Sequence, residues 1–289
     1  MGDDKHLMVA ESQAIYWTDD GFFTPEVGAW AETKYQLVHM YNQLFATGMK
    51  KLWHKRIYID LFAGAGKAKI RKTNKFVLAS PMLALNIPDK YDRYIFCDEN
   101  KKSLDALHKR IEREHPDIDV HFVLGDCNKK VDEILKRVPR YSKSNKVLSF
   151  CFVDPYNLEI EFETIRKLST FFMDFLILLA FSMDANRNEA AYVKPENNRI
   201  DNFLGLPEWR VIWEKEKQTG KDFRRFLAEQ FAQQMIVLGY KRESLDSMIE
   251  MRSDEKNLPL YHLGFFSRNQ KGYEFWNKVR KYVRQPSFF

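Results

Sequence analysis

The stretch from Tyr58 to Gly66 narrows the choice of fold more than any other part of the sequence. Its β-branched and aromatic residues favour a buried strand, and its two closing glycines predict a turn at which the backbone can approach a ligand. A dinucleotide-binding turn would need a third glycine where this chain has Lys69, and a P-loop would need glycine and Ser or Thr where it has Leu61 and Ala68. What remains is a strand with an acid, Asp60, near its end and a Gly-x-Gly turn after it. An ordinary strand-to-helix turn is the alternative.

Strand and helix patterns alternate after this stretch, which predicts an α/β fold with a mostly parallel sheet flanked by helices. Residues 67–75 are basic and lack apolar periodicity, so we expect a long loop over the edge of the sheet. The predicted strands are 56–62, 94–97, 147–153 and 175–181, with another within 117–124, and the predicted helices are 82–86, 101–114, 131–138 and 161–168.

The regions around this alternating part have other patterns. Residues 1–50 read as a helical N-terminal extension that starts near Thr24-Pro25, and residues 51–183 form the Rossmann-like core. Residues 184–258 are first polar and then helical, which predicts an insertion after the fifth strand that faces the substrate. Residues 259–289 supply a last strand and a terminal helix that complete the core.

The composition excludes several classes of protein. The chain has 289 residues, of which 45% are hydrophobic and 15% aromatic, so it can bury a sizeable core and is not globally disordered. Met1 to His6 contain no apolar leader, and the longest apolar run, Phe175 to Phe181, is too short to span a bilayer. A net charge of +6 is compatible with a nucleic-acid partner or simply with a soluble surface. We expect no membrane association.

The cysteines and histidines do not predict a metal site. Cys97, Cys127 and Cys151 match no standard zinc spacing, are too few and too spread for a disulfide framework, and are typical of small buried residues. The seven histidines include no His-Glu-x-x-His pattern. We expect no bound metal and a reducing, cytoplasmic setting.

Four consecutive predicted strands end in an acid: Asp60, Asp98, Asp126 and Asp154. In an open parallel sheet, ligands bind outside the carboxyl ends of the strands, so these side chains should gather at one edge. A single Asp is common where a strand turns, but four in series predict a binding site.

The acid at a strand end followed by Gly-x-Gly resembles the first motif of class I S-adenosylmethionine-dependent methyltransferases. That cofactor carries an ammonium, a ribose diol and an adenine amine, for which carboxylates are the natural acceptors. The resemblance implies that Asp98 binds the ribose, although Asp98 follows the glycines later than the roughly 20 residues of a compact βαβ unit, so Glu99 stays open as the alternative. It also places Asp60 near the methionine part and Asp126 on the adenine amine, with Phe62, Ala63, Gly64, Gly66 and Cys127 lining the cofactor.

Asp154-Pro155-Tyr156 resembles the Asp-Pro-Pro-Tyr motif of amino-methyltransferases, with one proline missing. In those enzymes the acid and a backbone carbonyl accept hydrogen bonds from the target amine, and the ring stacks on a planar substrate, often a base rotated out of its helix. Catalysis would consist of alignment and desolvation rather than covalent chemistry. The plainer interpretation is a strand end capped by Asp-Pro, with Tyr156 packing on it.

The chain as a whole is similar to the three-Cys-motif partner proteins. That resemblance implies a Rossmann-type methyltransferase fold and a partner, a radical-SAM-like protein that carries the cysteine motif, while the family has no settled substrate. The matching pieces are Trp30-x-x-x-Lys34, Tyr58 to Gly66, Ser80-Pro81, Gly125-Asp126-x-Asn128, Val153 to Tyr156, Asn186-Arg187, Arg199-x-Asp201 and Phe265-x-Ser267.

These patterns predict an S-adenosylmethionine-dependent methyltransferase that acts on an amine of a nucleobase or of a nucleic acid, DNA or RNA. One alternative is a nucleic-acid- or partner-binding module without turnover, and another is a subunit that delivers substrate to the radical-SAM-like partner, because fold alone does not choose among them. The expected substrate contacts are Lys67, Lys69, Arg71, Asn157, Asn186 and Arg187.

Overall fold

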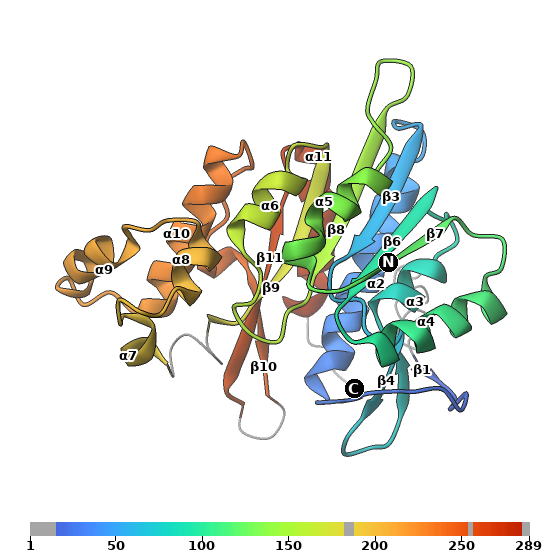
Figure 1. Cartoon of the computed structure of the whole chain (residues 1–289), viewed down its shortest axis with the longest axis horizontal. Helices are drawn as coiled ribbons and strands as arrows, with labels where there is room; N and C mark the ends of the chain where they lie inside the picture. The colour runs from blue at the N-terminus through green and yellow to red at the C-terminus, as the bar shows by residue number, and fades with distance from the viewer. Residues whose placement is uncertain (1–15, 182–187, 254–256, 285–289) are drawn as a thin grey trace.

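The computed structural model describes residues 16–181, 188–253 and 257–284. A seven-stranded sheet forms its centre, in the order β10-β11-β9-β8-β3-β6-β7 (Figure 1). Five of these strands are parallel, whereas β11 runs antiparallel to both β9 and β10. The strands are β3 (Lys55–Asp60), β6 (Arg93–Asp98), β7 (Val120–Leu124), β8 (Val147–Val153), β9 (Met173–Leu179), β10 (Ile249–Arg252) and β11 (Pro259–Phe266).

This strand order confirms the predicted fold class. The five parallel strands follow the Rossmann order 3-2-1-4-5, and an antiparallel strand lies beside the fifth, as in Rossmann-like class I methyltransferases. Every residue of β8 and β9 is buried, which is expected of central strands covered on both faces. Their burial explains why both strands read as unbroken apolar runs in the sequence.

Helices cover both faces of the sheet. On one face, Tyr41 of α2 (Trp30–Met49) contacts Phe265 of β11 and Trp276 of α11 (Gln270–Arg284). The next residue of β11, Phe266, points to the other face, where it contacts Phe231 of α10 (Phe223–Val237). The remaining core helices, α3 (Ser80–Leu85), α4 (Lys101–Glu114), α5 (Cys127–Arg137) and α6 (Phe162–Leu168), connect successive strands (Figure 1).

A second, smaller sheet replaces the loop that we expected over residues 67–75. β4 (Lys67–Ile70) and β5 (Phe76–Leu78) form an antiparallel hairpin, to which β1 (Tyr16–Trp17) and β2 (Glu26–Val27) add at either side. The loop prediction was wrong because Ala68, Ile70 and Val77 are buried and anchor the hairpin, so only its turn is exposed.

The N-terminal region also differs from the prediction. No helix begins at Thr24-Pro25; residues 16–29 cross the molecule as a strap that contains β1 and β2, and helix α2 starts at Trp30. We call residues 16–29 the N-terminal strap.

The region after β9 is largely helical, as expected, but it also supplies a strand. Trp209 and Trp213 pack against Phe223 and Phe226, which joins two helices at the left of Figure 1. β10, which the sequence analysis did not foresee, lies in this region and completes the large sheet. The helices are α7 (Glu189–Tyr192), α8 (Arg199–Leu204), α9 (Trp209–Lys217) and α10, followed by the short 3-10 turn η2 (Leu245–Ser247).

No helix in the described part of the chain is long and apolar enough to cross a membrane. Likewise, residues 16–181, 188–253 and 257–284 contain no group of three or more His, Cys, Asp or Glu side chains that could hold a metal ion.

Candidate functional site

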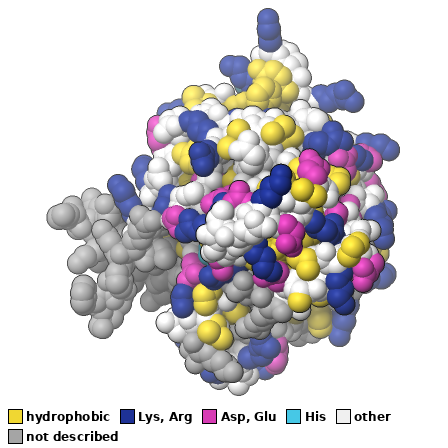
Figure 2. Space-filling view, turned by 90° about the vertical axis from the view of Figure 1, so that its left-hand side faces the viewer, with side chains coloured by type: hydrophobic (Ala, Val, Ile, Leu, Met, Phe, Trp, Pro, Cys, Tyr) yellow, Lys and Arg dark blue, Asp and Glu magenta, His cyan; other side chains and the backbone are white. Residues whose placement is uncertain are grey.

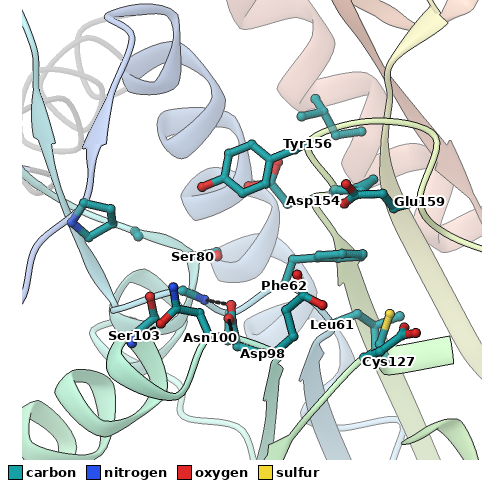
Figure 3. A pocket seen from close by; sticks show the side chains of 18 of the residues that line it. Leu61, Phe62, Ser80, Asp98, Asn100, Ser103, Cys127, Asp154, Tyr156 and Glu159 are labelled. Carbon is teal, nitrogen blue, oxygen red and sulfur yellow. Dashed lines mark hydrogen bonds between the residues drawn. The ribbon is translucent and has the colours of Figure 1, made fainter. Parts of the chain in front are cut away.

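A pocket of about 700 Å³ opens at the carboxyl ends of the parallel strands, where the sequence predicted a binding site. Figure 3 shows side chains from the ends of β3, β6 and β8 converging on it, together with residues from the starts of α4 and α5. The predicted residues that line it are Phe62, Ala63, Gly64, Lys67, Asp98, Asp126, Cys127, Asp154, Pro155 and Tyr156.

The glycine turn forms the floor of the pocket, and its two glycines have different reasons to be there. Both have positive φ, 63° at Gly64 and 80° at Gly66. A Cβ at Gly66 would come within 2.6 Å of the side chain of Leu107, so the packing of α4 requires a glycine. A Cβ at Gly64 would meet nothing within 4 Å, so this residue leaves open space on the pocket side.

Asp98, at the end of β6, is fixed to the glycine turn. Its Oδ2 accepts a hydrogen bond of 2.7 Å from the backbone N–H of Gly64, and its Oδ1 accepts one of 2.8 Å from that of Asn100 (Figure 3). Burial raises the pKa of Asp98, and these two hydrogen bonds oppose that effect. Each oxygen keeps a further lone pair for a ligand, while Glu99, the alternative, is exposed beside it.

Asp126 and Cys127 lie at the start of α5. Asp126 caps this helix, because its Oδ1 accepts from the N–H of Asn128 at 2.9 Å. Burial raises the pKa of the Cys127 thiol, which is therefore neutral at ordinary pH. The side chain of Asn128 donates to the carbonyl of Glu159 at 2.9 Å and so ties the loop after β8 to this helix.

Asp60 does not line the pocket. Its carboxylate is fully buried beneath the turn, where it accepts from the hydroxyl of Tyr58 at 3.1 Å and from the N–H of Phe62 at 3.3 Å. Burial raises the pKa of Asp60 to about 7, and the nearby charge of Asp154 adds to the rise. Asp60 therefore supports the turn from below, and its predicted contact with a cofactor stays a prediction.

Asp154, at the end of β8, forms an ion pair that the sequence patterns did not predict. Nζ of Lys34 lies 2.5 Å from its Oδ2, and both side chains are nearly buried. The Lys34 ammonium also lies 4.9 Å and 4.7 Å from the ring centroids of Trp30 and Tyr35. The available signal was a lysine in the apolar stripe of α2, one turn after Trp30.

Tyr156 stands at the mouth of the pocket. Its side chain is 73% exposed, and Figure 3 shows the ring over Asp154. Its backbone carbonyl accepts from the hydroxyl of Tyr261 at 3.2 Å, and the Tyr261 ring lies 4.9 Å from that of Trp30. Aromatic side chains from three distant segments thus surround the Lys34–Asp154 pair. The side chain of Asn157 turns instead to Glu159, with Nδ2 3.3 Å from Oε1.

Of the other expected substrate residues, Lys67 lines the pocket, whereas Lys69 and Arg71 do not. Lys67 is fully buried, and its ammonium lies 2.8 Å from Asp20 of the strap, so a substrate contact would require this pair to open. Lys69 is partly exposed on β4 and Arg71 is exposed at the hairpin turn. Asn186 and Arg187 lie outside the described residues. Pocket-lining residues that the site prediction lacked include Trp30, Lys34, Tyr35, Ser80, Asn100, Ser103, Asn128, Glu159, Arg199 and Tyr261.

Comparisons with known proteins assign no family to this chain. No protein-family model matches the chain, and no curated protein matches it. Among solved structures, protein LPL1258 from Legionella pneumophila is 13% identical, with a TM-score of 0.40 over 59% of this chain and 73% of that one. An S-adenosylmethionine-dependent methyltransferase from Clostridium acetobutylicum is 10% identical, with a TM-score of 0.29 over 52% and 53%. The bifunctional kinase-methyltransferase WbdD is 13% identical, with a TM-score of 0.41 over 91% and 46%. Membership of the three-Cys-motif partner family stays a prediction.

Proposed function

We propose that this chain binds S-adenosylmethionine at the pocket and transfers a methyl group to an amine of a nucleobase or of a nucleic acid. The observation that carries the proposal is the hydrogen bond from the N–H of Gly64 to the carboxylate of Asp98. It places this carboxylate beside a glycine turn that has open space for a ligand at the pocket floor.

The residues at the pocket fit the cofactor. The space beside Gly64 admits a ligand close to the backbone, Asp98 suits a ribose diol, and Asp126 suits the adenine amine. The pocket volume of about 700 Å³ is in the range of cofactor sites. S-adenosylmethionine supplies a methyl group on a positively charged sulfur, and transfer of that group to a nitrogen leaves a neutral thioether.

The residues at the mouth suit an aromatic amine. Oδ2 of Asp154 accepts a hydrogen bond from Lys34, and among the described residues Oδ1 has no donor. Oδ1 is therefore left as an acceptor for an amine hydrogen and for the proton that the nitrogen loses. The exposed ring of Tyr156 offers a face on which a base can stack. Lys69 and Arg71, on the hairpin that borders the pocket, would contact phosphates of a longer substrate.

Two observations favour the alternative of a binding module without turnover. Lys34 already neutralises Asp154, and a proline of the amino-methyltransferase motif is missing. Such a module would bind cofactor or nucleic acid for another protein, for which the radical-SAM-like partner implied by the family resemblance is the candidate.

Calorimetry with S-adenosylmethionine and S-adenosylhomocysteine tests the cofactor. We expect both to bind, and we expect Asp98→Ala to weaken binding at least about tenfold, because a charged hydrogen-bond acceptor is lost. The matched control is Asp105→Ala, an exposed acid of α4 that pairs only with Lys101 among the described residues. Absence of binding by the purified chain would overturn the proposal.

Transfer of a labelled methyl group to nucleosides, DNA and RNA tests the reaction. We expect transfer to one of these pools and its loss in Asp154→Asn and Tyr156→Ala. Cofactor binding without transfer to any pool would favour the binding module instead.

A further inference from the structure

The edge of the sheet opposite the pocket, where the parallel strands begin, carries a separate surface. Two connections meet there: residues 50–54 lead from α2 into β3, and residues 139–146 lead from α5 into β8 (top of Figure 1). The N–H groups of His54 and Lys55 donate to the carbonyl of Lys146 at 2.9 and 3.0 Å, and the N–H of Lys146 donates to Nδ1 of His54 at 3.0 Å. These bonds hold the two connections side by side.

Three aromatic side chains form a cluster on this surface. The ring of Trp53 lies 5.6 Å from that of Phe172 and 6.4 Å from that of Tyr141, and the last two lie 4.6 Å apart. Tyr141 is 42% exposed and Phe172 is 47% exposed. A contiguous group of exposed apolar side chains can mark an interaction site, whereas single ones are common on protein surfaces.

Positive charge surrounds the cluster. Five exposed cations come from the two connections and their strand ends, and neither 50–55 nor 139–146 contains an acid. Within the part of the chain that the structure describes, no ion pair involves any of the five. Figure 2 shows the projecting tip at the top of the view with lysine, arginine and hydrophobic side chains and without acidic ones. The five cations are Lys51, Lys55, Arg140, Lys143 and Lys146. We call these cations, with Trp53, Tyr141 and Phe172, the amino-edge surface.

We propose that the amino-edge surface binds single-stranded nucleic acid. Exposed rings provide planar faces on which unpaired bases stack, and unpaired lysine and arginine side chains attract the phosphates between those bases. The rings are tilted by 51° to 64° to one another, so each presents its own edge or face rather than one closed stack. Base pairs of a duplex would hide the faces that these rings need.

A lipid surface fits less well. An interfacial membrane site inserts its most projecting residues, and these should be apolar. Here the connection 139–146 has Ser142, Lys143 and Ser144 at its turn, and all three are exposed and polar. The observations therefore favour a nucleic-acid strand, and lipid binding becomes an outcome of the test.

The amino-edge surface is independent of the pocket. The two lie at opposite ends of β3 and β8, which have 6 and 7 residues, and at ~3.3 Å per residue this separates them by ~20 Å. The proposal goes beyond the proposed function and does not require methyl transfer.

Fluorescence anisotropy tests whether the amino-edge surface binds single strands. The full chain is mixed with labelled oligothymidylate or oligouridylate of about 20 nucleotides. We expect binding that weakens steeply as salt rises from about 50 to about 200 mM. Lys51→Glu with Lys143→Glu should weaken binding at least about tenfold, because two phosphate contacts become repulsive. The matched control is Lys215→Glu with Lys278→Glu, which changes the same charge on exposed residues of α9 and α11.

Further variants test whether bases stack on the aromatic rings of the amino-edge surface. Tyr141→Ala with Phe172→Ala should also weaken binding at least about tenfold, and Tyr141→Phe should retain it, because the ring and not the hydroxyl is needed. Urea unfolding checks that each variant is folded. The proposal would be overturned if the lysine variant and its control bound equally well, or if the ring variant bound as tightly as the parent chain. It would also be overturned if a duplex bound more tightly, or if phosphatidylserine vesicles bound and the oligonucleotides did not.

Discussion

Two buried lysine–aspartate pairs in this molecule look alike and differ in what surrounds them. Lys67 and Asp20 lie 2.8 Å apart, with side chains 0% and 7% exposed. Lys34 and Asp154 lie 2.5 Å apart, with side chains 6% and 13% exposed. By distance and burial alone, the two pairs would be expected to do the same work.

Asp20 is surrounded by further donors. Arg110 donates to both of its oxygens at 2.8 Å, and Nη2 of Arg113 lies 3.2 Å away. Burial would raise the pKa of Asp20, but the hydrogen bonds and charges of Arg110 and Lys67 hold it well below its usual range. Arg110 also donates to the carbonyl of Ala65 at 2.5 Å. The cluster therefore fastens the N-terminal strap to the glycine turn.

Among the described residues, one cation, Lys34, pairs with Asp154. Burial raises its pKa, and Lys34 only partly opposes that rise. The pair faces the pocket beside the exposed ring of Tyr156. A buried pair of this kind is structural when each charge has several partners. It is available for a ligand when one carboxylate oxygen, here Oδ1 of Asp154, has no partner among the described residues.

Asp20→Asn should have the largest effect on stability. It leaves the buried ammonium of Lys67 and the guanidinium of Arg110 without their carboxylate, and breaking a buried pair in this way costs about 3–5 kcal/mol. Urea unfolding measures the loss. Asp19→Asn, at the exposed neighbouring position, is the control and should change the free energy of unfolding by less than about 0.5 kcal/mol. A loss of that small size in Asp20→Asn would mean that the strap is not fastened by this cluster.

Asp60 has no cation as a partner among the described residues. Its contribution to stability should therefore change with pH in the direction opposite to that of Asp20. The pKa of Asp60 is raised to about 7, above its value in the unfolded chain, so the folded protein holds this proton more tightly and loses stability as pH rises through about 7. Between about pH 5 and about pH 8 this loss amounts to about 3 kcal/mol. Asp60→Asn removes one titrating group and should reduce the slope of that part of the curve, measured by urea unfolding at several pH values. Asp174, whose pKa burial also raises to about 7, still contributes to the remaining slope.

The control for this pH effect is Asp20→Asn. The pKa of Asp20 is lowered, so its contribution is complete above its unfolded value and is lost only in more acidic solution. Asp20→Asn should therefore leave the slope between about pH 5 and about pH 8 unchanged. Equal slopes in Asp60→Asn and the parent chain would contradict the raised pKa.

The sequence predicted the parts of the fold that local patterns encode. The strands β8 and β9 read as apolar runs because they are buried on both faces, and Asp98 and Asp126 were found because strands of a parallel sheet end at one edge. β10 was missed because a four-residue strand gives only two periods of alternation.

The parts of the fold and site that the sequence did not predict depend on ion pairs between residues far apart in the chain. Lys67 reads as a surface cation until Asp20, far earlier in the chain, is seen to neutralise it, and the hairpin was therefore taken for a loop. Lys34 pairs with Asp154, which lies 120 positions later in the chain, and no local sequence pattern around either residue predicts this pair. Charges that are buried by distant partners look like solvent-exposed charges in a sequence.

Lys34→Met gives the smallest effect and the sharpest test of the comparison. Asp154 faces the pocket and can take up a proton when its cation is removed, so the free energy of unfolding should fall by only about 1 kcal/mol near pH 6 and by more above pH 8. Urea unfolding of Lys34→Met, and of Lys34→Met combined with Asp154→Asn, measures this. The double variant should lose the added dependence on pH, because position 154 no longer carries a titrating carboxyl. A loss in Lys34→Met as large as that of Asp20→Asn would show that both pairs are structural, and Asp154 would then be no acceptor for a substrate.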